Sequence, residues 1–178
     1  ERTLEEAGML VRSLLSAGVD TTVTGIGSGL WCLASFPDEF ERLKADPKLA
    51  RPAFEEALRY TSPVHTFCRT ADVDTEVSGV AIAKDTKILC VLGAANLDGE
   101  HWSEADRFDI ARRPTGHLAF GTGIHGCVGQ NVARAEVEAV LLAIADKVGA
   151  IEMTGEAVWR PNNAIHALDR MPIRFHPK

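Results

Sequence analysis

The hydrophobic pattern of the first 36 residues predicts one long helix. Apolar residues recur from Leu4 to about Phe36 with few helix breakers apart from a glycine cluster, Gly18, Gly25, Gly27 and Gly29. A helix of about 30 residues spans roughly 45 Å, which is long for a globular domain. Glycine weakens a helix interior. The glycine-bearing middle of this helix therefore needs a structural or functional reason.

Three prolines divide the next stretch of chain. Pro37 and Pro52 each stand at a position that suits the first turn of a helix. We therefore predict short helices over residues 37–45 and 52–60. Pro63 blocks any extension of the second helix, because the residue before a proline is disfavoured in helical conformation.

The rest of the chain alternates between strand-like, irregular and helical patterns. β-Branched residues punctuated by turn signals predict short strands and hairpins over residues 64–90. Residues 92–120 lack a regular pattern, and irregular stretches of this length are usually functional. Residues 127–148 are apolar all round, which predicts a helix buried on most sides. With short strands again over residues 150–176, the fold class is mainly α with small β-sheets (α+β).

Composition excludes several classes of protein. The chain has 178 residues, of which 46% are hydrophobic and 25% charged, as in a soluble globular domain with one core. It contains no run of 18 apolar residues, so we expect no membrane span. The net charge of −6 argues against nucleic-acid binding. Because the first residues are too polar for a signal peptide, we expect a cytoplasmic protein.

Four cysteines are widely spaced along the chain, at Cys32, Cys68, Cys90 and Cys127. Without a C-x-x-C pair, a zinc or iron–sulfur site is disfavoured, and without a sign of secretion so are disulfides. The first three are interpreted as buried free thiols. The fourth differs because of its neighbours.

The segment around Cys127 combines four glycines in ten residues, Phe120-Gly121-Thr122-Gly123-Ile124-His125-Gly126-Cys127-Val128-Gly129. Such a loop lets the backbone approach a flat ligand closely. It ends where the apolar helix is predicted to begin. Free amide groups and the positive end of the helix would favour a thiolate there, which suits Cys127 to ligate a metal.

This segment resembles the haem-binding loop of the cytochrome P-450 family, whose pattern is Phe-x-x-Gly-x-x-x-Cys-x-Gly. Phe120, Gly123, Cys127 and Gly129 match that pattern. The resemblance implies that Cys127 is the thiolate ligand of the iron in haem b. It also implies that His125, where the family often has arginine, meets a haem propionate.

A second motif, Ala17-Gly18-Val19-Asp20-Thr21-Thr22, lies within the long predicted helix. Gly18 leaves room for a ligand, and Thr21 can hydrogen-bond back to the Ala17 carbonyl and open the helix. Alone, the motif equally fits an ordinary kink. It resembles the oxygen-binding groove of the same family. That resemblance makes Ala17 and Gly18 cofactor contacts, and Asp20 and Thr21 catalytic residues that relay protons.

A third motif is Glu56-Ala57-Leu58-Arg59, whose two charges share one helical face. Alone, such a pair is usually a surface salt bridge of little value. The resemblance implies instead a buried structural triad, with Arg107 of Asp106-Arg107-Phe108 as its third member. The sequence departs from the family just before Arg107, with Ala105 and Asp106 in place of proline and glutamate.

Further positions follow from the resemblance. Arg69 is expected to bind a haem propionate, as a fixed guanidinium suits a carboxylate. Arg112 and Arg113 are candidates for docking an acidic electron-transfer protein, although exposed arginines are more often only solvated. Substrate contacts are expected from positions in three separate segments of the chain, Leu14, Val64, His65, Phe67, Ala164 and Ile165.

The resemblance covers essentially the whole chain, yet members of the family are more than twice as long. Residues 1–178 are therefore interpreted as the C-terminal haem-binding portion, with the N-terminal half absent. The predicted activity is a bacterial-type monooxygenase. It would insert one oxygen atom from dioxygen into a small organic substrate of the aromatic-acid class, with electrons from NAD(P)H through a ferredoxin reductase and a ferredoxin.

The alternative is a truncated, haem-poor, non-catalytic fragment. A long apolar helix without its partners would expose hydrophobic surface. We therefore expect the 178-residue fragment itself to be inactive, to associate with itself, and to retain haem weakly or not at all.

Overall fold

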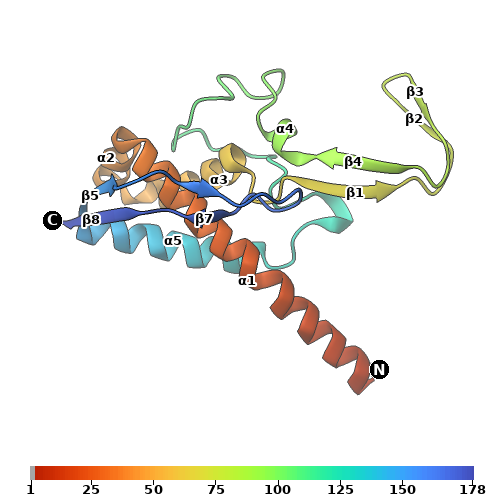
Figure 1. Cartoon of the computed structure of the whole chain (residues 1–178), viewed down its shortest axis with the longest axis horizontal. Helices are drawn as coiled ribbons and strands as arrows, with labels where there is room; N and C mark the ends of the chain where they lie inside the picture. The colour runs from red at the N-terminus through yellow and green to blue at the C-terminus, as the bar shows by residue number, and fades with distance from the viewer. Residues whose placement is uncertain (1–2) are drawn as a thin grey trace.

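The computed structural model describes residues 3–178, in which five α-helices lie around small antiparallel sheets (Figure 1). The helical elements are α1 (Leu4–Ser35), α2 (Pro37–Ala45), the 3-10 turn η1 (Pro47–Leu49), α3 (Ala50–Thr61), α4 (Leu92–Asn96), the 3-10 turn η2 (Gly123–His125) and α5 (Gln130–Lys147). None of the helices within residues 3–178 is both long and apolar enough to cross a membrane. The predicted mixture of helices with small sheets is confirmed.

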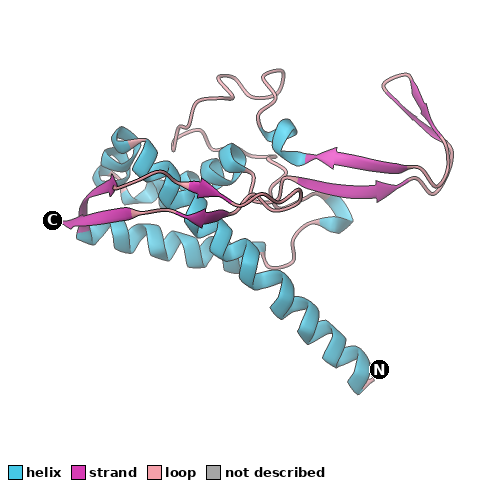
Figure 2. Cartoon of the chain, viewed as in Figure 1, coloured by secondary structure: helices cyan, strands magenta, loops and turns pink. Residues whose placement is uncertain are grey.

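The strands form four separate two-stranded antiparallel sheets, as Figure 2 shows. β1 (Thr66–Thr70) pairs with β4 (Lys87–Val91), and the hairpin of β2 (Thr75–Val77) and β3 (Val80–Ile82) extends from their far end. Near the C-terminus, β5 (Val148–Met153) pairs with β8 (Ile173–Pro177), and β6 (Val158–Trp159) pairs with β7 (Leu168–Arg170). The strands predicted over residues 64–90 are therefore present.

Helix α1 is one continuous helix with two different environments. Thr3 and Glu6 form a capping box at its start. Its second half packs against α3 and α5, whereas its first half projects away from the other elements (Figure 1). Large apolar side chains of that first half are exposed, Met9, Leu10, Val11, Leu14, Leu15 and Val19.

The core lies where the second half of α1 meets α2, α3, α5 and β5. Its largest buried apolar side chains include Leu33, Phe54 and Leu141. A Cβ on Gly25 would stand 3.3 Å from the Phe54 ring, so glycine allows α1 to approach α3 closely. This packing accounts for one of the glycines that weaken the long helix.

Two predictions about burial are wrong. Helix α5 begins at Gln130 rather than at Cys127, and it is not buried on most sides: Val132 is 62% exposed. Of the three cysteines expected to be buried, Cys32 is buried but Cys68 is exposed and Cys90 is partly exposed. The last two lie on the β1–β4 pair, a two-stranded sheet that no further strand of residues 3–178 extends and most of whose residues are exposed.

The predicted ion pair on α3 is fully buried. Arg59 donates two hydrogen bonds of 2.8 Å to Glu56 and three more to the carbonyls of Asn96, Ala105 and Arg107. The third charged partner is Arg112, whose Nε lies 2.9 Å from Glu56. These bonds attach the irregular segment to α3.

The prediction that the Arg107 side chain completes this triad is wrong. The backbone carbonyl of Arg107 accepts a hydrogen bond from Arg59. The side chain of Arg107 points outward instead, where it is 55% exposed and pairs with Glu104. Arg112 reaches Glu56 instead, and its side chain is 14% exposed. Arg112 is therefore occupied in the triad and unsuited to the docking role considered for it.

Substituting the two arginines separates these roles. Arg112→Met should lower the free energy of unfolding by about 3 kcal/mol, because it leaves part of a buried carboxylate unpaired. Arg107→Met should change it by less than about 0.5 kcal/mol, as expected for an exposed surface pair. Urea unfolding of both variants measures the difference, and equal effects would contradict the assignment.

Candidate functional site

A largely apolar cavity of about 260 Å³ lies between the middle of α1, the segment from α3 to β1, and the loop that carries Cys127. It brings together most of the site residues predicted from the sequence. The predicted positions among its lining are Leu14, Ala17, Gly18, Thr21, Val64, Phe67, Phe120, Cys127 and Gly129.

The α1 side of this cavity has the predicted local geometry. The Thr21 hydroxyl donates a 2.9 Å hydrogen bond to the Ala17 carbonyl. The position that a Cβ would take on Gly18 has no other atom within 4 Å, so the space beside this glycine is open. Small residues and one hydroxyl therefore form this wall.

Asp20 lies on a different side of α1. It is exposed and lines a separate cavity of about 360 Å³ together with Thr24 and Arg160. The Thr24 hydroxyl donates to the Asp20 carbonyl at 2.7 Å. Asp20 and Thr21 are thus adjacent in sequence but face two different cavities.

The Cys127 loop is closed by hydrogen bonds between backbone groups. The Cys127 amide donates to the Phe120 carbonyl at 2.8 Å, and η2 lies between these two residues. Gly121 has a φ of +68°, and a Cβ there would approach the His125 carbonyl oxygen to 2.9 Å. Glycine is therefore required at this position for the loop to fold back on itself.

The residues around Cys127 fit a flat, apolar group that carries a metal. The thiol lines a cavity with small residues of α1 on the opposite wall. Beside the thiol, Ile124 is 98% exposed and Val128 is 84% exposed. Bare apolar side chains around a thiol are the surroundings that a haem needs, and Cys127 is the residue here that can ligate its iron.

Two residues expected to bind haem propionates lie on the surface. His125 is exposed in η2. Arg69 is exposed on β1, donates to the Cys68 carbonyl at 2.9 Å, and lies over the Phe67 ring at 5.7 Å. Both side chains carry donors that a carboxylate accepts, and their role stays a prediction.

Three residues predicted to contact substrate are absent from the lining of the Cys127 cavity. The His65 ring stacks on His166 with 4.3 Å between centroids, and its amide donates to the Ala164 carbonyl at 2.8 Å. Ile165 forms a β-bridge with Val64. These contacts attach Ala164 and Ile165 to the segment before β1, and Ile165 lines the separate cavity that contains Asp20. Burial and the neighbouring His166 lower the pKa of His65.

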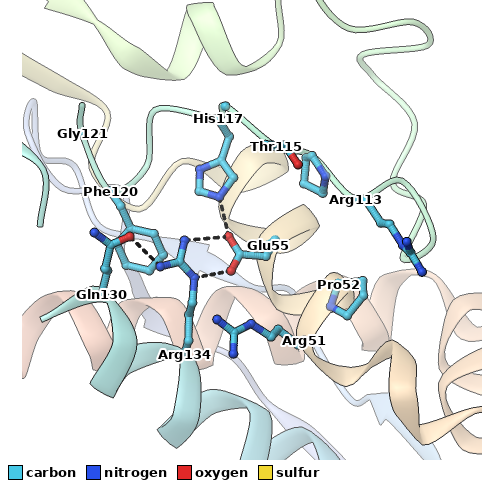
Figure 3. A pocket seen from close by; sticks show the side chains of 12 residues that line it. Arg51, Pro52, Glu55, Arg113, Thr115, His117, Phe120, Gly121, Gln130 and Arg134 are labelled. Atoms are coloured by element: carbon cyan, nitrogen blue, oxygen red, sulfur yellow. Dashed lines mark hydrogen bonds and ion pairs between the residues drawn. The ribbon is translucent and has the colours of Figure 1, made fainter. Parts of the chain in front are cut away.

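A second cavity, of about 470 Å³, lies on the other side of Phe120 and was not predicted. Figure 3 shows Glu55 of α3 between His117 and Arg134 of α5. Phe120 and Gly121 border both this cavity and the one that contains Cys127. Arg113 is exposed at its rim.

Glu55 is the electrostatic centre of this second cavity. Burial by itself would raise the pKa of Glu55, but hydrogen bonds from His117 and Arg134 lower it to about 2. Sequence spacing gave no signal for these contacts, because the partners of Glu55 lie 62 and 79 residues further along the chain.

The free energy of unfolding should depend on pH through Glu55. Its pKa is lower in the folded state than the ordinary 4.5, so its contribution is complete above about pH 4.5 and is lost as pH falls toward 2. We expect Glu55→Gln to lower the free energy of unfolding by about 2 kcal/mol at neutral pH. Urea unfolding between pH 2 and 7 measures this effect.

Glu138→Gln is the matched control, since Glu138 pairs with Arg51 only at 3.9 Å on the surface. It should cost little at any pH. The wild-type and Glu55→Gln values should converge between pH 4.5 and 2. A difference that stays constant through that range would rule out this origin.

Comparison with known proteins agrees with this arrangement. The family model described as Cytochrome P450 matches residues 1–147. Cytochrome p450 CYP199A2 of Rhodopseudomonas palustris is 55% identical over 99% of this chain. The 6-deoxyerythronolide B hydroxylase of Saccharopolyspora erythraea is 35% identical over 96% of the chain. The structure of CYP109Q5 from Chondromyces apiculatus superposes on the whole chain with a TM-score of 0.95 and 34% identity.

The chain spans less than half of each of these proteins, 43% of the two relatives and 46% of the CYP109Q5 chain. The family match nevertheless includes every residue that lines the Cys127 cavity. The chain belongs to the cytochrome P450 family.

Proposed function

We propose that residues 1–178 are the C-terminal, haem-binding portion of a haem-thiolate monooxygenase. The observation that carries this proposal is the cavity shared by the Cys127 thiol and the Ala17–Thr21 face of α1. Cys127 would ligate the iron of haem b, with His125 and Arg69 at its propionates. Activation of dioxygen is the chemistry that a bound haem supplies.

Residues of α1 would leave room for dioxygen beside the iron and would relay protons there. Gly18 keeps room for dioxygen next to the Thr21 hydroxyl. That hydroxyl donates a hydrogen bond to the Ala17 carbonyl, so the lone pairs of its oxygen can accept a hydrogen bond from the cavity side. Asp20 lines the separate cavity on another side of α1. There it would take up protons from solvent.

Substrate and electrons would reach the site from different sides. Leu14, Val64 and Phe67 form apolar walls that suit a small organic substrate, for which we propose the aromatic-acid class. Electrons would come from NAD(P)H through a ferredoxin reductase and a ferredoxin. The exposed Arg113 at the second cavity suits contact with an acidic ferredoxin.

A second candidate is a haem-poor, non-catalytic fragment that self-associates. The exposed apolar side chains on the first half of α1 favour it, since large uncovered apolar patches are typical of interaction surfaces. The two candidates differ in whether iron is bound through a thiolate.

The reduced carbon monoxide spectrum tests the ligand and separates the two candidates. The intact protein should show the red-shifted Soret band of a thiolate-ligated haem, and Cys127→Ala should abolish it. Cys68→Ala is the matched control, because Cys68 is an exposed thiol on β1 outside the cavity. Absence of the band from the wild-type protein would favour the fragment, and its survival in Cys127→Ala would refute the assigned ligand.

Thr21→Ala tests the role of the hydroxyl in the cavity. It should lower the product formed per NAD(P)H consumed by roughly tenfold, because the cavity loses the hydroxyl that would relay protons. Thr24→Ala removes the same kind of bond to the helix backbone on the other face of α1. This variant should form as much product per NAD(P)H consumed as the wild type. Unchanged coupling in Thr21→Ala would exclude this role.

A further inference from the structure

Glu55 joins three parts of the chain beneath the Cys127 loop. Arg134 of α5 bonds both carboxylate oxygens of Glu55, and the Nε2 of His117 lies 2.7 Å from Glu55. Gln130 accepts a further bond from Arg134 at 2.6 Å. The side chain of His117 is only 4% exposed. This Glu55 cluster, formed by Glu55, His117 and Arg134, is thus fixed by several bonds (Figure 3).

Two members of the Glu55 cluster reach the start of the loop directly. The Arg134 guanidinium lies 4.4 Å from the centroid of the Phe120 ring, within range of a cation–π interaction. The Nδ1 of His117 accepts the amide of Ala119 at 3.2 Å. Because Nδ1 accepts, the proton of a neutral His117 is on Nε2, which donates to Glu55.

Phe120 transmits these contacts to Cys127. Its carbonyl accepts the Cys127 amide at 2.8 Å, and Phe120 borders both the cavity of the Glu55 cluster and the cavity of Cys127. Arg134 holds its charge against a residue that also borders the cavity of the thiol, so the field of that charge extends toward the thiol. Low-polarity surroundings strengthen such an effect.

We propose that Glu55, His117 and Arg134 are positioning residues for the metal ligand. They hold Phe120 and the start of the loop in place, and the paired charges of Glu55 and Arg134 set the electrostatic potential at the iron. The electrostatic part rests on the proposed function, whereas the positioning part applies to the protein with or without haem.

Arg51 provides a matched control for Arg134. It lines the same cavity and carries the same charge, but it is 53% exposed and pairs with Glu138 at 3.9 Å, whereas Arg134 lies over the Phe120 ring. Arg51→Met and Arg134→Met therefore remove the same charge from the same cavity. They differ in that only Arg134→Met removes the contacts with Glu55, Gln130 and Phe120.

Hydrogen exchange on the haem-free intact protein tests the positioning. In Arg134→Met, the amides of Ala119 and Cys127 should exchange roughly tenfold faster than in the wild type, equivalent to about 1.4 kcal/mol of lost restraint. Arg51→Met should match the wild type, and Arg134→Lys should be intermediate. Equal exchange in Arg134→Met and Arg51→Met would overturn the proposal.

The reduction potential of the haem-loaded intact protein tests the electrostatic part. Arg134→Met leaves the negative charge of Glu55 unbalanced and should lower the potential, whereas Glu55→Gln leaves Arg134 unbalanced and should raise it. Arg134→Lys should restore the wild-type potential. A purely structural role predicts no opposite effects of the two substitutions on the potential. Changes of the potential in the same direction would therefore overturn the proposal. A wild type that binds no haem would refute the proposed function, and hydrogen exchange would still decide the positioning.

Discussion

The irregular part of this structure depends on a fully buried ion pair between Glu56 and Arg59. Removing two charges from water is costly unless every polar atom finds a partner. Here the partners are carbonyls of residues 96, 105 and 107, the amide of Asp109, and the Arg112 guanidinium. A segment with almost no regular structure is therefore held in one path, because any other path would leave a buried charge unpaired.

The next residue of α3 extends this control to the cysteine loop. Glu55 and Glu56 are adjacent, so their side chains leave the helix in directions about 100° apart. Glu56 bonds the irregular segment, and Glu55 bonds His117 and Arg134. Asn96 connects the two regions, since its carbonyl accepts from Arg59 and its side chain accepts the Leu118 amide. One rigid helix thus locates both the path toward the loop and the loop's first residues.

Contiguous patterns were predictable from the sequence, and long-range partners were not. The bounds of α1 and α2 follow from apolar spacing and proline, and the local bond of Thr21 to Ala17 follows from the helix itself. Motif resemblance placed Cys127 and Gly18 at one cavity.

The failures share a physical cause. Whether Arg107 offers its side chain or its carbonyl depends on a turn whose path is set by Arg59, 48 residues earlier. His65 lies next to Val64, yet its ring stacks on His166, which periodicity cannot reveal. The Glu55 cluster likewise joins positions that no local spacing relates. Spacing along a chain predicts which face a residue occupies, but the partner on that face is chosen by the tertiary fold.

The exposed apolar side chains show the same limit of hydrophobic patterns, which do not identify the partner of a residue. The apolar residues around α1 and α5 indicate that these helix faces are covered by other groups. The pattern does not indicate which groups cover them. Ile124 and Val128 lie in the Cys127 loop, so a haem bound as we propose would cover them. Met9 and Leu10 lie about one turn of α1 before Leu14 and do not line that cavity, so another apolar surface has to cover them. Exposure at the two places therefore has different causes, although the sequence pattern that produces it is the same.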